Sequence, residues 1–126
     1  MQPDEIRLNP AKDALSLVWS DTRAALPAEY LRVESPSAEV KGHGVGQGRL
    51  ISGKRAVTIT GLEPVGAYAV KIVFSDGHST GLFTWAYLRE LADQHATRWA
   101  AYLADMDKAG LSRDVAGRLV LRADLQ

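Results

Sequence analysis

The sequence contains no cysteine, and this absence excludes several kinds of site at once. Disulfides, thiolate nucleophiles and zinc or iron–sulfur sites with cysteine ligands all require a thiol. The chain of 126 residues also has no net charge, because 15 basic residues balance 15 acidic ones. Without an excess of positive charge there is no long-range attraction to phosphate backbones or anionic lipids. We therefore expect neither a nucleic-acid partner nor a membrane partner.

Long apolar runs are missing as well. No stretch approaches the roughly 20 residues that a membrane-spanning helix needs, and the polar, acidic residues 1–9 do not resemble a signal peptide. We therefore expect a cytoplasmic protein. A chain of this length with 46% hydrophobic residues can bury a core without a disulfide or a metal. The expected organisation is one domain, residues 1–110, followed by a tail, residues 111–126, that forms a short helix or strand or frays.

Alternating apolar and polar residues predict the strands of this domain. The segments with this alternation are 6–8, 15–19, 22–26, 56–62, 68–74 and 79–83. Pro27 suits the first position of a short helical turn that ends at Arg32. Apolar residues at 3.6-residue spacing predict a long helix from about Thr84 to a C-cap at Gly110. Five glycines between Val40 and Gly53 indicate a loop.

One supersecondary pattern occurs twice in the chain. Residues 17–21 and 72–76 both contain an apolar triplet that ends in an aromatic residue, followed by Ser-Asp, and each is followed by Tyr-Leu-Arg, at 30–32 and 87–89. A unit of this size has one apolar face that it cannot bury alone, so the two copies should share a core. We predict an α+β domain with a mixed or antiparallel sheet built from two strand–turn–strand–helix units, and with the long C-terminal helix packed on it.

The most specific stretch is residues 75–89, which read Ser-Asp-Gly-His-x-Thr-Gly-x-Phe-x-Trp-x-Tyr-Leu-Arg. Together with residues 30–40, with His43 and with Pro-Val-Gly-x-Tyr at 64–68, it resembles the N-terminal domain family of gamma-butyrobetaine hydroxylase. The resemblance covers about residues 3–107. In the hydroxylases of this family an oxygenase domain follows. The present chain is too short to contain that domain, so the resemblance does not imply oxygenase activity.

The same resemblance implies a zinc site that this chain has lost. In the family, the motif Leu-Arg-x-x-Cys-Pro-Cys-x-x-Cys and a later histidine bind a structural zinc ion. The three cysteine positions correspond to Ser35, Ser37 and Val40, and the histidine corresponds to His78. A neutral serine hydroxyl is a poor zinc ligand and valine is none. We therefore expect neither zinc nor any other cofactor.

Several polar residues remain candidates for contact with a ligand or a partner. His78 lies in a turn directly after Asp76, where it bonds backbone groups, contributes to a site that a partner completes, or acts as a general base. His43 lies in the glycine-rich loop, which is either a plain flexible loop or one whose backbone amides approach a ligand. Arg49 and Arg55 belong either to a solvated turn or to a patch for an acidic partner.

No second catalytic group accompanies these residues, so we expect that the protein is not an enzyme. The main prediction is a non-catalytic accessory domain that binds a protein partner through the glycine-rich loop and the paired strand–turn units. Because an edge strand of the sheet can pair with an edge strand of a second copy, we also expect a homodimer. The alternative is a small-ligand or metal-binding accessory protein, with His43, His78 and Glu34 or Glu39 as ligands. Because the domain also resembles an appendage of Mrp-like ATPases that carry iron–sulfur clusters, this alternative is linked to iron–sulfur biology.

Overall fold

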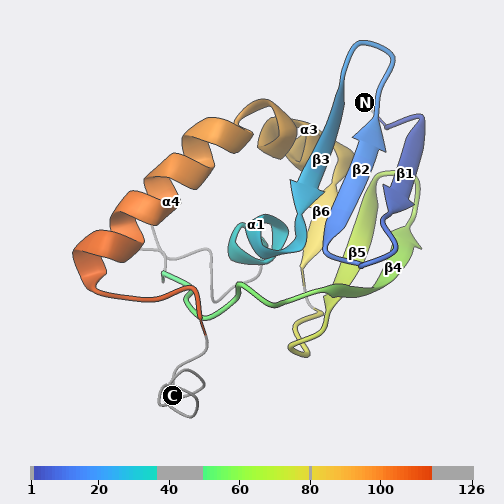
Figure 1. The fold of residues 1–126 in the computed structure, drawn as a ribbon. Coiled ribbons are helices and arrows are strands. Elements are labelled where there is room, and N and C mark those ends of the chain that lie inside the picture. Colours follow the sequence, from blue (N-terminus) through green and yellow to red (C-terminus); the bar gives the residue numbers. More distant parts are fainter. Residues whose placement is uncertain (1, 37–49, 80, 115–126) are drawn as a thin grey trace.

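The fold comes from a computed structural model that describes residues 2–36, 50–79 and 81–114. Its elements are β1 (Glu5–Leu8), β2 (Ala14–Val18), β3 (Arg23–Pro27), α1 (Ala28–Val33), β4 (Ile59–Val65), β5 (Ala69–Phe74), β6 (Leu82–Thr84), α3 (Trp85–Asp93) and α4 (His95–Ala109) (Figure 1). The predicted α+β class is confirmed. The duplicated unit is also present, since each half contains three strands followed by a helix. No helix in these ranges is long and apolar enough to cross a membrane.

The first sheet contains β1, β2 and β3, which pair antiparallel in sequence order. On the central strand β2, Leu15 and Leu17 are fully buried, whereas Ser16 between them is only partly covered. This is the alternation from which the strand was predicted. The helix α1 begins directly after β3, and Pro27, the last residue of the strand, has extended backbone angles and serves as the N-cap of α1.

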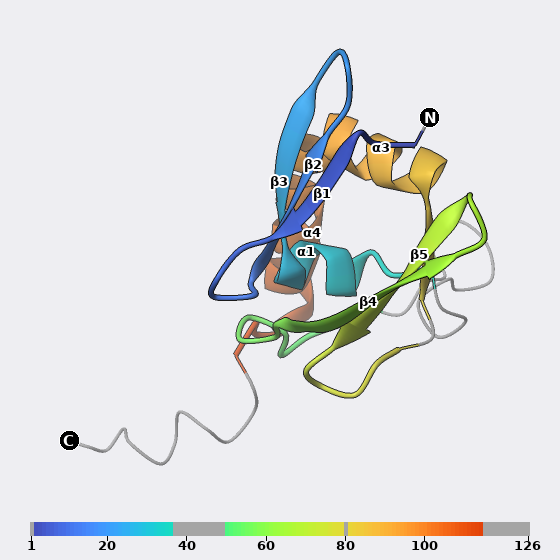
Figure 2. The same ribbon diagram turned by 90° about the vertical axis from the view of Figure 1, so that its right-hand side faces the viewer.

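The second sheet contains β4, β5 and β6, also antiparallel and in sequence order. The repeat predicts one sheet, but the described strands of each half pair only with one another, so the structure has two separate sheets. The two halves meet where the Ile59 N–H donates to the Lys12 carbonyl at 2.8 Å, and Figure 2 shows α1 between them.

The strand β4 begins and ends three residues later than predicted. Pro64 is tolerated inside it because β4 is an edge strand, and the turn follows at Gly66, with φ 55°.

The prediction of one long C-terminal helix is wrong, because α3 ends at Asp93 and α4 begins at His95. Thr84 caps the first of these helices, since its hydroxyl accepts the Tyr87 N–H at 3.0 Å. Gly110 caps the second in the left-handed conformation, as predicted. The break allows α3 to pack on β3 and β6, while α4 changes direction and lies away from both sheets (Figure 1).

One core joins the two halves. It contains side chains from both sheets, from α1 and from α3, and its fully buried members include Leu15, Leu17, Leu26, Leu31, Ile59, Ile72, Phe83, Leu88 and Leu91. Two polar aromatic groups reach into it with their donors satisfied. The Tyr30 hydroxyl donates to the Leu91 carbonyl at 2.8 Å, and the Trp85 indole donates to the Ala67 carbonyl at 2.8 Å.

Residues 111–114 form neither a helix nor a strand, but they are attached to the body of the domain. The Gly53 and Arg55 N–H groups donate to the carbonyls of Ser112 and Arg113, both at 2.9 Å. The Arg113 guanidinium donates two hydrogen bonds, of 2.7 and 2.6 Å, to the carboxylate of Glu29 on α1. The rest of the predicted tail, 115–126, lies outside the described residues.

Candidate functional site

Two of the positions that the family resemblance assigns to zinc ligands lie next to each other. Ser35 follows α1, and His78 lies in the turn after β5, 43 residues later. The Ser35 Oγ and the His78 Nε2 are 3.0 Å apart and form a hydrogen bond. Ser35 is completely buried. The other two positions, Ser37 and Val40, lie outside the described residues.

Gly81 packs directly against this pair. A Cβ atom placed on Gly81 would lie 2.1 Å from the Ser35 Oγ and 3.3 Å from the Phe83 ring. The first distance is far below van der Waals contact, so no larger residue fits while the Ser35–His78 hydrogen bond is in place. Gly81 is therefore required by close packing and not by an unusual backbone angle.

Asp76 holds the same turn through three charged or polar partners. Its Oδ2 accepts from the Arg32 Nε at 2.9 Å and from the Lys54 Nζ at 2.5 Å, and its Oδ1 accepts the His78 backbone N–H at 3.1 Å. Burial alone would raise the pKa of Asp76. The hydrogen bonds from Lys54, His78 and Arg32 outweigh that effect and lower this pKa to about 2. The carboxylate thus stays charged and ties α1 to the turn.

We expect Asp76→Asn to destabilise the domain by about 1–2 kcal/mol at pH 7, because two charged hydrogen bonds are removed. A lowered folded-state pKa gives a contribution that is present above the unfolded value of roughly 3.9 and is lost as the pH falls toward the folded value of about 2. Urea unfolding curves of the wild type and the variant should therefore converge between about pH 4 and pH 2. Asp93→Asn is the control, since Asp93 is 56% exposed and pairs with Arg89 at the surface, so it should cost less than about 0.5 kcal/mol.

The chemistry available to the Ser35–His78 pair is limited by its burial. A serine nucleophile with a histidine base needs a substrate within reach of the hydroxyl, and the fully buried Ser35 offers no such access. Metal binding is not favoured either, because the donor set here is one neutral hydroxyl and one imidazole already bonded to each other. Among the described residues, no three His, Cys, Asp or Glu side chains gather as metal ligands would.

The remaining predicted contact residues are dispersed. His43 and Arg49 lie outside the described residues, so their convergence with His78 stays a prediction. Arg55 is half exposed, and its Nε pairs with Asp114 at 2.8 Å. Glu34, proposed as a ligand beside the histidines, instead accepts a hydrogen bond from the Arg98 guanidinium at 2.8 Å.

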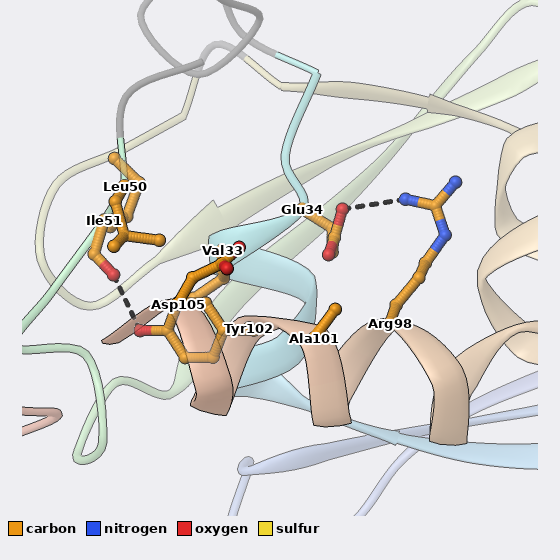
Figure 3. Close-up of a pocket in the computed structure, with 8 residues that line it drawn as sticks. All are labelled: Val33, Glu34, Leu50, Ile51, Arg98, Ala101, Tyr102 and Asp105. Carbon is orange, nitrogen blue, oxygen red and sulfur yellow. Dashed lines mark hydrogen bonds and ion pairs between the residues drawn. The ribbon is translucent and has the colours of Figure 1, made fainter. Parts of the chain in front are cut away.

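A second site, which sequence reasoning missed, is a pocket of about 240 Å³ between the end of α1, Leu50–Ile51 and α4 (Figure 3). Its lining residues are Val33, Glu34, Leu50, Ile51, Arg98, Ala101, Tyr102 and Asp105. The Tyr102 hydroxyl donates to the Ile51 carbonyl at 2.6 Å and closes one end. Burial raises the pKa of Glu34, although the charge of Arg98 and its hydrogen bond partly offset this. No signal in the sequence indicated this pocket, because Glu34 and Arg98 are 64 residues apart in the chain.

Comparison with known proteins places this geometry in a family. Residues 6–89 match the family described as gamma-butyrobetaine hydroxylase-like, N-terminal. Two solution NMR structures are similar: one has a TM-score of 0.78 and 50% identity and covers 90% of each chain, and the other has a TM-score of 0.75 and 39% identity and covers 93% of this chain and 91% of that one. No curated protein matches.

A crystal structure from Acidithiobacillus ferrooxidans, of a protein with unknown function in the DUF971 family, has a TM-score of 0.60 and 41% identity and covers 72% of this chain and 92% of that one. The family match spans two thirds of the chain and includes both Ser35 and His78, which the fold brings together. The chain belongs to the gamma-butyrobetaine hydroxylase-like N-terminal domain family.

Proposed function

We propose that this domain is a non-catalytic accessory module that acts by binding a protein partner. One observation carries the proposal: the polar groups at the two described ligand positions, and the Asp76 carboxylate beside them, are committed to internal contacts. The Ser35 hydroxyl is buried against His78, and the Asp76 carboxylate is held by Arg32 and Lys54. These groups stabilise the scaffold, which supports an outward-facing surface as the part that binds the partner.

The outward face of α4 is the surface best suited to a partner. Trp99, Tyr102 and Met106 face the body of the domain, and the last two are buried. On the other side, four exposed residues at helical spacing are small or apolar, namely Ala96, Ala100, Leu103 and Ala104, and the exposed Asp107 has the same spacing. Leu103 is 38% exposed. Small side chains allow another helix to approach closely, and a leucine supplies an apolar anchor.

Site-specific photo-crosslinking in cells tests the proposal. A photoreactive residue at position 100, on α4, should give one discrete adduct with another protein, whereas the same residue at position 25, on the exposed side of β3, should give none. Leu103→Glu should abolish the adduct because it places a charge in the apolar contact. Equal labelling from both positions, or an adduct that survives Leu103→Glu, would contradict a specific partner surface on this helix.

A metal-binding or small-ligand accessory role is the second candidate, because the Ser35 and His78 side chains still converge at 3.0 Å. The link to iron–sulfur biology, the cytoplasmic location and the homodimer remain predictions from the sequence. Elemental analysis of protein purified without chelators separates the two candidates. One metal ion per chain would favour the second candidate, and a substoichiometric amount would favour the first.

A further inference from the structure

The pocket between α1 and α4 has an unbalanced charge. Arg98 is the only basic residue among those that line it, and its three nitrogens are already used: by Glu34 at 2.8 Å, by Gln94 at 2.8 Å, and by Glu90. Asp105, which also lines the pocket, forms no ion pair with any residue in the described ranges. The two carboxylates that line the pocket, Glu34 and Asp105, therefore face one guanidinium, which pairs with Glu34 but not with Asp105, and the lining keeps a net negative charge.

The rest of the pocket is apolar and aromatic. Val33, Leu50, Ile51 and Ala101 form its walls, and Tyr102 lies at one end (Figure 3). An alkyl chain with a charged tip suits such a lining, because the methylenes cover apolar surface while the cation reaches the carboxylates. An aromatic ring beside the cation adds a further attraction.

The size of the pocket limits its occupant. Its volume of about 240 Å³ is below the roughly 300–1,000 Å³ that drug-sized ligands and cofactors occupy, so a single side chain is the better fit. We propose that this pocket receives a lysine or arginine side chain of the protein partner, between Asp105 and the Glu34–Arg98 pair. The inference rests on the proposed partner-binding function. It adds a second, chemically defined contact on the side of α4 that faces α1, separate from the outward face.

The test uses small probes on the isolated full chain and needs no partner. We expect n-butylguanidinium and n-butylammonium, titrated at constant ionic strength, to shift the backbone amide signals of Ala101, Tyr102 and Asp105 in NMR spectra in a saturable way. Butanol and butyrate, matched in length, should not. Asp105→Asn should weaken binding of the cations roughly fivefold. Asp107→Asn removes the same charge two positions along α4, outside the pocket, and should change binding less than about twofold.

An equal response to butanol, or an equal effect of the two asparagine variants, would overturn the basic-side-chain assignment. Dispersed spectra of both variants would show that they are folded. The two proposals fail separately. If position 100 crosslinks a partner and the cations do not bind, only the pocket assignment fails. If the cations bind selectively and no partner is crosslinked, the assignment of the cation to a protein partner fails.

Discussion

Gly81→Ala is expected to destabilise the domain by about 2–4 kcal/mol. The added Cβ would lie 2.1 Å from the Ser35 Oγ, and Ser35 is fully buried. The hydroxyl must rotate away, which ends its hydrogen bond with His78. Overpacking of a dense interior costs about 1–3 kcal/mol, and the loss of a hydrogen bond adds about 0.5–1.5 kcal/mol. Urea unfolding at neutral pH measures the sum.

A double-mutant cycle with Ser35→Ala identifies the cause. Alone, Ser35→Ala should cost about 1 kcal/mol, because His78 loses a partner. In that background the nearest atoms to the new Cβ are the residue 35 Cβ at 3.4 Å, an ordinary contact, and the Phe83 ring at 3.3 Å, which must shift by a few tenths of an ångström. Gly81→Ala should then cost less than about 1 kcal/mol, which gives a coupling energy above about 1 kcal/mol. Additive effects would show that the serine hydroxyl is not what excludes a side chain at position 81.

The features that local sequence determines were predictable. Alternation identified the strands, Gly66 and Gly110 have the positive φ values that their turn and cap require, and the repeated Ser-Asp motif indicated the duplicated unit. The meeting of Ser35 with His78 was predictable only through the family resemblance, because 43 residues separate them and neither residue is unusual in its own segment.

Features set by distant contacts were not predictable. The break at Gln94 was not predictable, because no proline or glycine marks it and the periodicity of apolar residues continues from α3 into α4. The pairing of Arg98 with Glu34, 64 residues apart, arises only when that break turns α4 toward the end of α1. The separation into two sheets depends on which strand edges meet in space, and alternation reports only which face of a strand is buried.

Arg113→Ala is expected to destabilise the domain by about 2–3 kcal/mol, although Arg113 lies outside the helices and strands, after α4. The side chain of Glu29 is only 8% exposed, and Arg113 is its bidentate partner. Breaking a buried ion pair leaves an uncompensated charge, which costs about 3–5 kcal/mol in a fully buried pair and less here because Arg113 is 29% exposed. The guanidinium also lies 5.2 Å from the centre of the Trp99 ring, and the same substitution removes this cation–π interaction.

Two further variants separate the buried charge from the simple loss of an arginine. Arg55→Ala is the matched control: Arg55 lies beside the same segment and pairs with Asp114, but it is 51% exposed, so its loss should cost less than about 0.5 kcal/mol. Glu29→Gln in the Arg113→Ala background should restore stability relative to Arg113→Ala, because no unpaired carboxylate remains in the interior. A further loss in the double variant would mean that packing of the arginine, and not the charge of Glu29, attaches residues 111–114 to α1. The Glu29–Arg113 pair thus joins α1, which forms one wall of the pocket, to the segment that follows α4, which forms the other.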